Sequence, residues 1–450
     1  MKKYEGIIIG FGKGGKTLAV EMAKKGFSVA IIEQSEEMYG GTCINIGCIP
    51  TKFLVNKSIK NQKSDLYEEN NKKYKKYIEE KNNFIKILRN KNYEMLDIYE
   101  NIDIYNGIGS FVNNKIIEIK TEAETIQIEG EKIFINTGAK NVIPPIKGIE
   151  NNDYIYDSKS IMELTKLPKN LVIIGGGYIG LEFAQIYRKF GSNVTVLESS
   201  LLFMPREERE IADRIKEILE NEGISIELGA KVEELKNQKV IYIKDGEVKE
   251  IEAEAILVAV GRKPNIDKLK LENTGIELGE RKEVKVDERL HTSIPNIWAI
   301  GDVHGGLQFT YTSLDDYRII KNELFENGKY TLNERKVVPY TVFLTPQFSR
   351  VGLTEKEAIE QGYKIKIAKM NTVTPKMKIM DSTNGILKVI IDENTNKILG
   401  ASFLMEDSAE IINIISITMK CNKEYSFLRD NIFTHPTVSE ILNDLFGLIK

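Results

Sequence analysis

The sequence of 450 residues has only three cysteines, far too few for the disulfide framework of a secreted protein. It also lacks any apolar run of the roughly 20 residues that a membrane-spanning helix needs. Neither sign of charge predominates, because 63 lysines and arginines face 66 aspartates and glutamates. This balance excludes the basic surface that a nucleic-acid or anionic-membrane partner would require. We therefore expect a soluble, cytoplasmic protein, and its length predicts about three domains.

Two segments of the chain carry the same pattern: a short apolar strand, a glycine-rich turn, a helix, and a second strand that ends in an acidic residue. The first turn contains Gly10, Gly12 and Gly15, and its acid is Glu33. The second turn contains Gly175, Gly177 and Gly180, and its acid is Glu198. In both copies the acid follows the third glycine by 18 positions.

Each part of this pattern has a physical reason in dinucleotide binding. Glycines let the backbone approach a pyrophosphate, the helix N-terminus supplies a positive dipole, and the acid accepts hydrogen bonds from ribose hydroxyls. Two such units predict two dinucleotides, FAD and a nicotinamide, between which hydride passes. A carboxylate at Glu198 favours NADH, because it would repel the 2′-phosphate of NADPH. Binding of NADPH through Arg206 is the alternative.

The two units predict an α/β protein with two Rossmann-like dinucleotide-binding domains, at residues 1–150 and 151–263. The segment that begins at residue 264 is typical of a loop-rich connection. The final part, residues 336–450, mixes strands with helices but has no glycine fingerprint. It is therefore predicted to be a separate α+β domain.

Cys43 and Cys48 lie five positions apart shortly after the first acid. On a helix they would occupy adjacent turns, close enough for a disulfide if the local backbone is irregular. A metal site is not expected, because zinc would need four ligands and the chain offers three histidines and one further cysteine. Two inert buried thiols remain the alternative to a redox disulfide beside a flavin, where a helix N-terminus would lower the thiol pKa. Cys421 stands alone in an apolar helical stretch and is expected in the core.

Four motifs together resemble the class I pyridine nucleotide-disulfide oxidoreductases, which include lipoamide dehydrogenase, glutathione reductase and mercuric reductase. They are the two glycine fingerprints, the Gly-Gly-Thr-Cys-Ile-Asn-Ile-Gly-Cys-Ile-Pro-Thr-Lys run at 40–52, the segment at 292–302, and His-Pro-Thr-Val-Ser-Glu at 435–440. The resemblance covers almost the whole chain. It implies an FAD- and nicotinamide-dependent enzyme, a central region at 264–335 that completes the FAD domain, and a homodimer formed through residues 336–450.

The resemblance also implies roles for individual side chains. Cys48 would be the charge-transfer thiol against the flavin, and Cys43 the interchange thiol that meets the substrate. His435, oriented by Glu440, would be the acid–base pair that reaches the cysteines of the partner subunit, so that the active site is shared between subunits. Lys52 and Glu182 would form an ion pair near the flavin, and Tyr178 would gate the nicotinamide pocket.

Further residues are implied as cofactor contacts. For FAD these are Gly10, Gly12, Gly15, Glu33, Gly41, Thr42, Thr137, Gly138, Gly301 and Asp302. For the nicotinamide they are Gly175, Gly177, Gly180, Glu198 and Gly261.

Within the family, the segments at 9–13, 37–43 and above all 306–318 are similar to the reactive-chlorine-resistance flavoproteins, which are associated with reduction of hypothiocyanous acid. This similarity implies a small sulfur electrophile as substrate and a role in oxidant defence. The alternatives are a dihydrolipoyl dehydrogenase or general disulfide reductase, a reductase of Cu(II) or another metal ion, and a catalytically silent nucleotide-binding scaffold.

Overall fold

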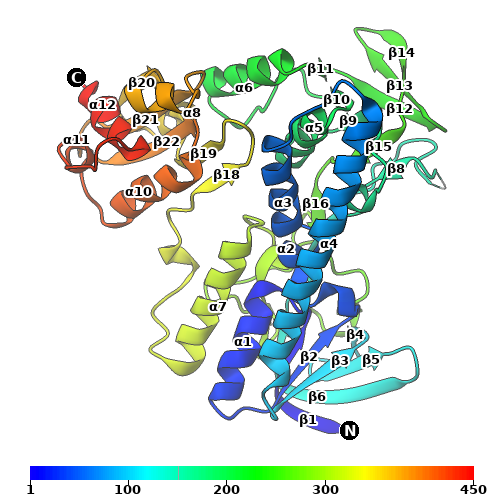
Figure 1. Cartoon of the computed structure of the whole chain (residues 1–450). Helices are drawn as coiled ribbons and strands as arrows, with labels where there is room; N and C mark the ends of the chain where they lie inside the picture. The colour runs from blue at the N-terminus through cyan, green and yellow to red at the C-terminus, as the bar shows by residue number, and fades with distance from the viewer. Residues whose placement is uncertain (151) are drawn as a thin grey trace.

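The computed structural model describes residues 1–150 and 152–450, so residue 151, where the second domain is predicted to begin, lies outside the described residues. Figure 1 shows three α/β bodies: one around the N-terminal strands, one beside it around the middle of the chain, and a third that contains the C-terminus. The predicted fold class is confirmed. Within the described residues no helix is long and apolar enough to cross a membrane.

The first body is built on a seven-stranded sheet whose parallel part is buried on both sides. Isoleucines fill its central strands, as expected for a sheet that helices cover. The strands run in the order β3 (Ile102–Asn106), β2 (Val29–Glu33), β1 (Lys2–Ile9), β6 (Thr125–Ile135), β5 (Ile116–Lys120) and β4 (Ile108–Phe111). A late strand, β17 (Ile297–Ala299), pairs in parallel with β6. The chain therefore returns to the first sheet after it has formed the second nucleotide unit.

The second body repeats the parallel arrangement. Its sheet has the order β11 (Ile224–Leu228), β10 (Asn193–Glu198), β9 (Asn170–Ile174), β15 (Ala255–Val258) and β8 (Ile155–Tyr156). Helices α5 (Tyr178–Phe190) and α6 (Arg209–Asn221) pack against it, and an antiparallel sheet is formed by β12 (Lys231–Lys236), β13 (Lys239–Lys244) and β14 (Glu247–Glu252). In both bodies a glycine turn therefore joins the first strand to its helix at the carboxyl edge of the sheet, where nucleotides bind.

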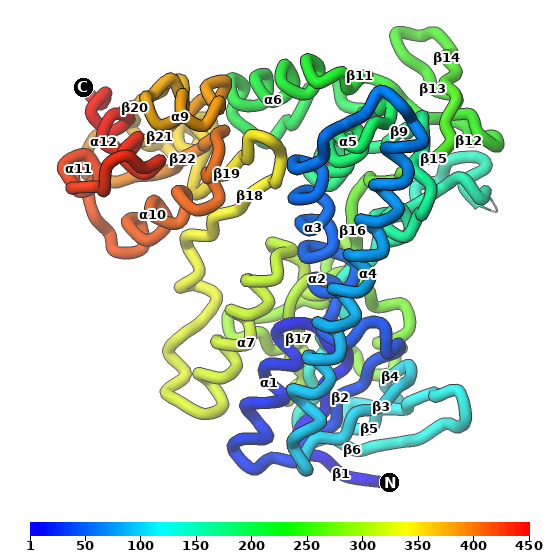
Figure 2. The backbone as a smooth tube through the Cα atoms, viewed as in Figure 1, coloured from blue at the N-terminus to red at the C-terminus, as the bar shows by residue number. Residues whose placement is uncertain are grey.

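Three consecutive helices connect the first two bodies: α2 (Gly41–Asn45), α3 (Cys48–Ile59) and the 31-residue α4 (Tyr67–Asp97). Figures 1 and 2 show α4 running from the first body to the second. Its apolar side buries Tyr74, Ile78 and Ile85 at helical spacing. Tyr74 also hydrogen-bonds to the hydroxyl of Tyr187 in α5 at 2.9 Å. The segment that carries Cys43 and Cys48 is thereby held between the two nucleotide bodies.

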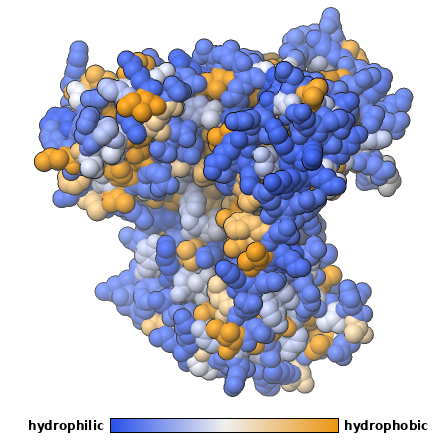
Figure 3. Space-filling view, in the orientation of Figure 1, coloured by the Kyte–Doolittle hydropathy of each residue, from blue (hydrophilic) through white to orange (hydrophobic). Residues whose placement is uncertain are grey.

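The third body has a five-stranded antiparallel sheet in the order β18 (Tyr340–Val342), β19 (Phe348–Gly352), β22 (Ile398–Leu404), β21 (Ile386–Asp392) and β20 (Ile365–Asn371). Its helices are α8 (Glu355–Glu360), α9 (Pro375–Ile379), α10 (Ser408–Lys420), α11 (Ser426–Arg429) and α12 (Ile441–Gly447). Several of its apolar side chains face outward, among them Ile417, Phe427 and Ile432. Apolar patches are visible over this body in Figure 3.

The expectation that Cys421 lies in the core is wrong, because its side chain is exposed. Helix α10 buries Ile411 and Ile415 against the sheet and exposes Ile417. Cys421 follows Ile417 by one helical turn, so it shares that outward face. Apolar neighbours in the sequence did not reveal which face of the helix the cysteine occupies.

The remaining elements are short, apart from α7 (Thr310–Phe325), which packs beside α1 (Lys13–Lys24) in the first body. A two-stranded link is formed by β7 (Ala139–Asn141) and β16 (Arg262–Pro264). Single 3₁₀ turns occur at Glu36–Met38, Ser160–Glu163, Leu271–Asn273, Gly301–His304, Leu332–Glu334 and Val438–Glu440.

Candidate active site

The first glycine turn (residues 10–15) is pressed against a buried asparagine at the end of β6. Gly10 has φ +106°, and a Cβ there would lie 2.3 Å from the carbonyl oxygen of Asn136. A Cβ at Gly12, the residue that caps α1, would lie 2.6 Å from Asn136 Oδ1. That same Oδ1 accepts from the backbone N–H of Gly15 at 3.1 Å, and Asn136 Nδ2 donates to the carbonyl of Ile300 at 2.9 Å. Asn136, which was not predicted, therefore holds the backbone of the first glycine turn in place.

Glu33 lies at the end of β2, where the glycine pattern predicts the ribose acid. Its carboxylate accepts from the backbone N–H groups of Phe11, at 3.1 Å, and Ser35, at 3.3 Å. Burial raises the pKa of Glu33 to about 7 despite these hydrogen bonds. The neighbouring Thr137 Oγ1 is buried without a hydrogen-bond partner among the described residues. This unpaired hydroxyl, together with a turn stripped of side chains, fits a dinucleotide such as FAD.

Two further segments that are predicted to contact FAD lie far apart in the sequence. A Cβ at Gly41 would lie 2.7 Å from the Cα of Gly12, so the Gly-Gly-Thr segment that contains Thr42 crosses directly over the first turn. The Gly301–Asp302 loop lines the same cleft, and burial raises the pKa of Asp302. Gly138, with φ +68°, borders the same space, and a Cβ added there would meet nothing within 4 Å.

A fully buried carboxylate in α7 holds the Gly301 loop. Asp316 accepts from the Gly301 N–H at 2.7 Å and from His304 Nε2 at 3.0 Å, and Arg335 pairs with its other oxygen. On the same helix, Ser313 Oγ accepts from the N–H of Gly14 in the first turn at 3.2 Å. The 306–318 segment, singled out in the sequence by its polar residues, thus joins the first turn to the Gly301 loop.

The second glycine turn (residues 175–180) has the predicted geometry but different surroundings. Gly175 has φ +106°, whereas a Cβ at Gly177 would meet nothing within 4 Å. Glu198 accepts from the N–H of Gly176 at 2.7 Å and from the N–H of Ser200 at 2.8 Å. Open space at Gly177, the N-cap of α5, is where a nicotinamide dinucleotide's pyrophosphate would fit.

Three other predicted or considered nucleotide contacts surround this turn. Gly180 is needed for packing, because a Cβ there would lie 2.2 Å from the Gly175 carbonyl oxygen. Gly261, with φ +118°, faces open space. Arg206 is exposed and borders the cleft described below, whereas Arg209 donates to the carbonyls of Phe203 and Met204.

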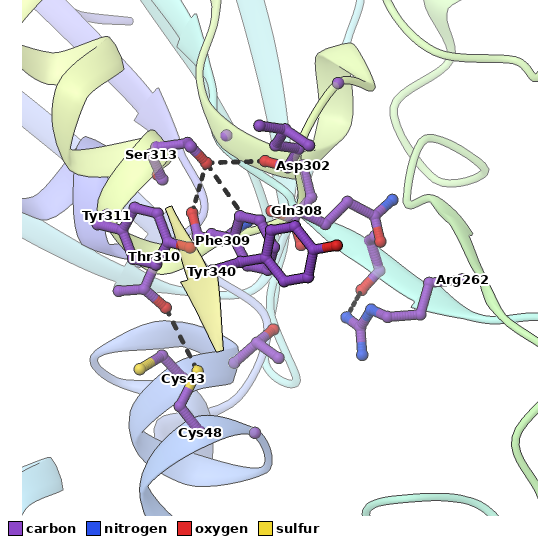
Figure 4. A pocket seen from close by; sticks show the side chains of 18 of the residues that line it. Cys43, Cys48, Arg262, Asp302, Gln308, Phe309, Thr310, Tyr311, Ser313 and Tyr340 are labelled. Carbon is purple, nitrogen blue, oxygen red and sulfur yellow. Dashed lines mark hydrogen bonds between the residues drawn. The ribbon is translucent and has the colours of Figure 1, made fainter. Parts of the chain in front are cut away.

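The two cysteines lie close together, and the backbone between them is irregular, which is the condition for a disulfide at this spacing. Helix α2 contains Cys43 and ends at Asn45, and α3 begins at Cys48. The break falls at Gly47, whose backbone angles (φ −128°, ψ −116°) are not helical. Figure 4 shows both sulfurs at one end of the pocket, facing Thr310.

The two thiols differ in acidity. The Cys43 thiol hydrogen-bonds to Cys48, which lowers the pKa of Cys48 to about 6. The Thr310 hydroxyl, 3.6 Å from Cys48 Sγ, and the Lys52 ammonium act in the same direction. The same hydrogen bond and burial raise the pKa of Cys43 well above its ordinary value. In the dithiol form, Cys48 is therefore the thiolate and Cys43 carries the proton, with the first position of α3 adding its dipole.

Lys52 and Glu182, predicted to pair, lie together beside the cysteines. Lys52 Nζ lies 2.7 Å from Glu182 Oε2, and Glu182 Oε1 accepts from the Phe343 N–H at 2.8 Å. Lys52 Nζ also lies 4.7 Å from the centre of the Phe343 ring. This ion pair joins α3, α5 and the start of the third body at one point.

Three further aromatic residues line the same cleft as Tyr178: Phe309 and Tyr311, from the 306–318 segment that the sequence singled out, and Tyr340, which was not predicted. The rings of Tyr178 and Tyr340 stack at 5.8 Å, those of Tyr340 and Phe309 at 6.0 Å, and those of Phe309 and Tyr311 at 5.0 Å. We call these four residues the aromatic row. They come from three distant segments, so no local sequence signal could have brought them together. Phe309, Tyr311 and Tyr340 are labelled in Figure 4.

A cleft of about 2640 Å³ joins these parts, from the first glycine turn past both cysteines to Tyr178 and the aromatic row. His435 is not among the described residues that line it. Instead His435 lies in the third body, with its side chain 78% exposed and its Nδ1 2.8 Å from Glu440 Oε1. One chain by itself therefore assembles the histidine–glutamate pair but does not bring it to the thiols.

Comparison with known proteins identifies the family. The family described as pyridine nucleotide-disulphide oxidoreductase matches residues 4–316, and its dimerisation domain matches residues 338–446. The chain belongs to this family. The predicted recognition is thus confirmed, together with its consequences: an enzyme with FAD and a pyridine nucleotide as cofactors, and a C-terminal domain of the kind through which the family dimerises.

Individual pyridine nucleotide-disulfide oxidoreductases give a finer comparison. The probable pyridine nucleotide-disulfide oxidoreductase RclA of Escherichia coli (strain K12) is 49% identical over 100% of both chains. A solved structure described as a Cu(II) complex of the HOCl-induced flavoprotein disulfide reductase RclA matches with a TM-score of 0.94 over 100% of both chains. A dihydrolipoyl dehydrogenase of Mycobacterium tuberculosis is 28% identical, over 100% of this chain and 99% of its own.

Proposed function

We propose that this flavoprotein disulfide reductase uses NADH to reduce hypothiocyanous acid through Cys43 and Cys48. The observation that carries the proposal is the pair of hydrogen-bonded thiols, one acidic and one protonated, in a cleft shared with both cofactor regions. Cys43 is half-buried and lines the same cleft as the aromatic row, and a small electrophile needs less room to reach a half-buried sulfur than a bulky disulfide does. The HOCl-induced relative at 49% identity supports a role in oxidant defence.

The chain's own residues account for the oxidant half of the reaction. Cys43 loses its proton and its sulfur attacks the sulfur of hypothiocyanous acid, which expels hydroxide and forms a Cys43 sulfenyl thiocyanate. Cys48, already a thiolate, then attacks the Cys43 sulfur, expels thiocyanate and forms the disulfide. The two thiols give up two electrons, the oxidant accepts them, and the proton from Cys43 converts hydroxide to water.

A histidine is suited to carry that proton, because its ordinary pKa lies near neutrality. His435 is held by Glu440 but stands outside the cleft of its own chain. We infer that it serves the thiols of the partner subunit in a homodimer. Ile432, three residues before it, is 96% exposed in one chain and would be covered at such an interface.

The first glycine turn, Glu33, Thr137 and the Gly301–Asp302 loop would hold FAD. When bound, the flavin supplies the two-electron relay that returns the disulfide to dithiol at the expense of the nicotinamide. For the nicotinamide, Glu198 favours NADH. Its carboxylate is fixed by two backbone N–H groups in the position to accept from a 2′-hydroxyl, while Arg206 is exposed and uncommitted to the turn.

The test is substrate-dependent NADH oxidation with hypothiocyanous acid, lipoamide, glutathione disulfide and Cu(II) as acceptors. We expect turnover with hypothiocyanous acid that falls by about three orders of magnitude in Cys43→Ser, as for loss of a covalent nucleophile. Cys421→Ser, which removes the exposed third cysteine, is the matched control and should keep full activity. Equal activity of Cys43→Ser and wild type would refute the proposal.

A second candidate is reduction of Cu(II), and the Cu(II) complex of the RclA relative is the observation that favours it. Soft thiolates bind copper well and a dithiol can reduce it. Among the described residues no group of three or more histidine, cysteine or acidic side chains forms a ready metal site. A solved structure is also described as a Cu(II) complex of the C43S mutant of RclA, so the copper of that relative is bound without the first thiol. Reduction of Cu(II), as distinct from its binding, would still need the dithiol, and the acceptor panel separates the two candidates.

A further inference from the structure

Glu207 is a buried carboxylate that the proposed reaction does not use. It lies just before α6, where the second nucleotide body meets the third, and its side chain is 0% exposed. The hydroxyls of Tyr178 and Tyr340 both donate to Glu207 Oε1, the latter at 2.7 Å. The other oxygen, Oε2, lies 3.5 Å from Arg350 Nη1. One carboxylate thus holds two tyrosines from different bodies.

The two tyrosines are fixed by their rings as well as by their hydroxyls. Tyr178 and Tyr340 stack with an angle of 27° between ring planes, and Phe309 continues the stack beyond Tyr340 at 16°. Burial beside the Glu207 carboxylate raises the pKa of both tyrosine hydroxyls. At neutral pH both hydroxyls therefore keep their protons and remain donors.

The position of Tyr178 makes this attachment relevant to cofactor access. Tyr178 follows Gly177 directly, at the first position of α5, and Glu182 lies one turn further on the same face. Tyr178 lines the same cleft as the Lys52–Glu182 pair beside the cysteines, and it directly follows Gly177, where a Cβ would meet nothing within 4 Å. A nicotinamide dinucleotide held at the second turn, with its ring directed at the Lys52–Glu182 pair, would extend alongside Tyr178.

We propose that Glu207 is a latch that holds Tyr178 closed, with Tyr340 as its second attachment in the third body. The proposal rests on the proposed use of a nicotinamide and on the gating role that the family resemblance implies for Tyr178. Glu207 is a positioning residue: it acts on the nicotinamide through Tyr178. In the open state Tyr178 has left Glu207, and only this state binds the nicotinamide. The hydrogen bond from Tyr178 to Glu207 keeps most molecules closed. The apparent dissociation constant for the nicotinamide is therefore the constant of the open state divided by the fraction of molecules that are open.

The test measures binding of NAD⁺ to the oxidised, FAD-loaded enzyme by calorimetry, with no turnover. Tyr178→Phe keeps the ring and removes only the hydrogen bond to the latch. We expect its dissociation constant for NAD⁺ to fall about fivefold, which is the order of one hydrogen bond to a charged acceptor. Glu207→Gln should lower it by a similar factor, and the double variant should gain no more than either single change.

Glu357→Gln is the matched control, because Glu357 also pairs with Arg350 but contacts neither tyrosine. It should leave NAD⁺ affinity unchanged. Hydrogen exchange at residues 177–181 gives a second readout and should accelerate in Tyr178→Phe and Glu207→Gln alone. If Glu207→Gln does not fold, Tyr178→Phe still decides the matter, since it leaves the Glu207–Arg350 pair intact.

Unchanged NAD⁺ affinity in Tyr178→Phe would overturn the latch. The latch would also be overturned if Glu207→Gln still changed NAD⁺ affinity in a protein that already carries Tyr178→Phe, because Glu207 would then not act through Tyr178. Neither result depends on which oxidant the enzyme reduces. Failure of the latch is therefore distinguishable from failure of the hypothiocyanous acid assay.

Discussion

The two glycine turns have the same sequence pattern but different surroundings. At the first, a Cβ on the middle glycine, Gly12, would collide with Asn136, and Ser313 also contacts the turn from α7. At the second, a Cβ on the equivalent Gly177 would meet nothing. The backbone at these two positions is nearly the same, with φ −67° and −77°. The difference therefore lies in what packs against the turn.

This difference matches the two ways in which an oxidoreductase uses its cofactors. A flavin stays bound through many turnovers, and the first turn is enclosed by segments from three parts of the sequence. A nicotinamide must enter and leave in each turnover, and the second turn is open at its middle glycine. We infer that the same glycine motif can hold a flavin that stays bound where protein packs against its middle glycine, and a nicotinamide that exchanges where the space at that glycine is open.

The matched variants Gly12→Ala and Gly177→Ala test this comparison most directly and should show the largest effect. Gly12→Ala should lower the free energy of unfolding by about 3 kcal/mol, because the new methyl would collide with the buried Asn136 side chain, and the purified protein should lose flavin absorbance. Gly177→Ala should keep its flavin and stay within about 0.5 kcal/mol of wild type. Its KM for the nicotinamide should rise about tenfold, since the methyl obstructs the pyrophosphate.

Urea unfolding and flavin absorbance check the first expectation, and steady-state kinetics check the second. The comparison would be broken by a Gly177→Ala protein that loses flavin, or by a Gly12→Ala protein that keeps it.

The ribose acid of the first unit should make stability depend on pH. Glu33 has a pKa of about 7 in the folded chain against 4.5 as its ordinary value. Between these values the folded chain keeps a proton that the unfolded chain has released. The free energy of unfolding of the flavin-free protein should therefore fall by roughly 2–3 kcal/mol as pH rises from 4.5 to 7.

Urea unfolding across this pH range measures the slope. Glu33→Gln, which cannot ionise, should flatten it, while the second unit's Glu198→Gln should leave it in place. A slope that survives in Glu33→Gln would assign the proton to another group.

The local parts of both units could be predicted from the sequence, because strand, glycine turn, helix and acid are all encoded within about 30 residues. The same holds for the cysteine pair and for His435 with Glu440, which the resemblance to the family supplied. Asn136, Glu207 and the stacking that unites the aromatic row could not be predicted, since each depends on contacts between distant segments. The irregular backbone between the cysteines was considered as a condition for their pairing, but its position at Gly47 was not predicted, because Gly47 alone does not show how a chain turns.

The acid of the second unit should set the choice of nicotinamide. Replacing Glu198 with serine removes the charge that would repel a 2′-phosphate. The ratio of kcat/KM for NADH to that for NADPH should fall about 30-fold, equivalent to about 2 kcal/mol. Glu227→Gln, which changes an acid on the adjacent strand β11, is the control and should leave the ratio unaltered. A wild-type preference for NADPH would mean that Arg206 dominates.

The smallest effect is expected where α7 supports the first turn. Ser313→Ala deletes the acceptor for the Gly14 N–H and should lower the free energy of unfolding by about 1 kcal/mol. Because that N–H belongs to the turn itself, flavin dissociation should also accelerate a few-fold. Ser192→Ala removes a comparably buried hydroxyl, bonded to the Pro168 carbonyl at 2.6 Å in the second unit, and should cost similar stability without affecting flavin release. If Ser313→Ala and Ser192→Ala released flavin equally fast, a general loss of stability would explain the release. The contacts that protein makes with the first glycine turn would then not explain why the two units differ.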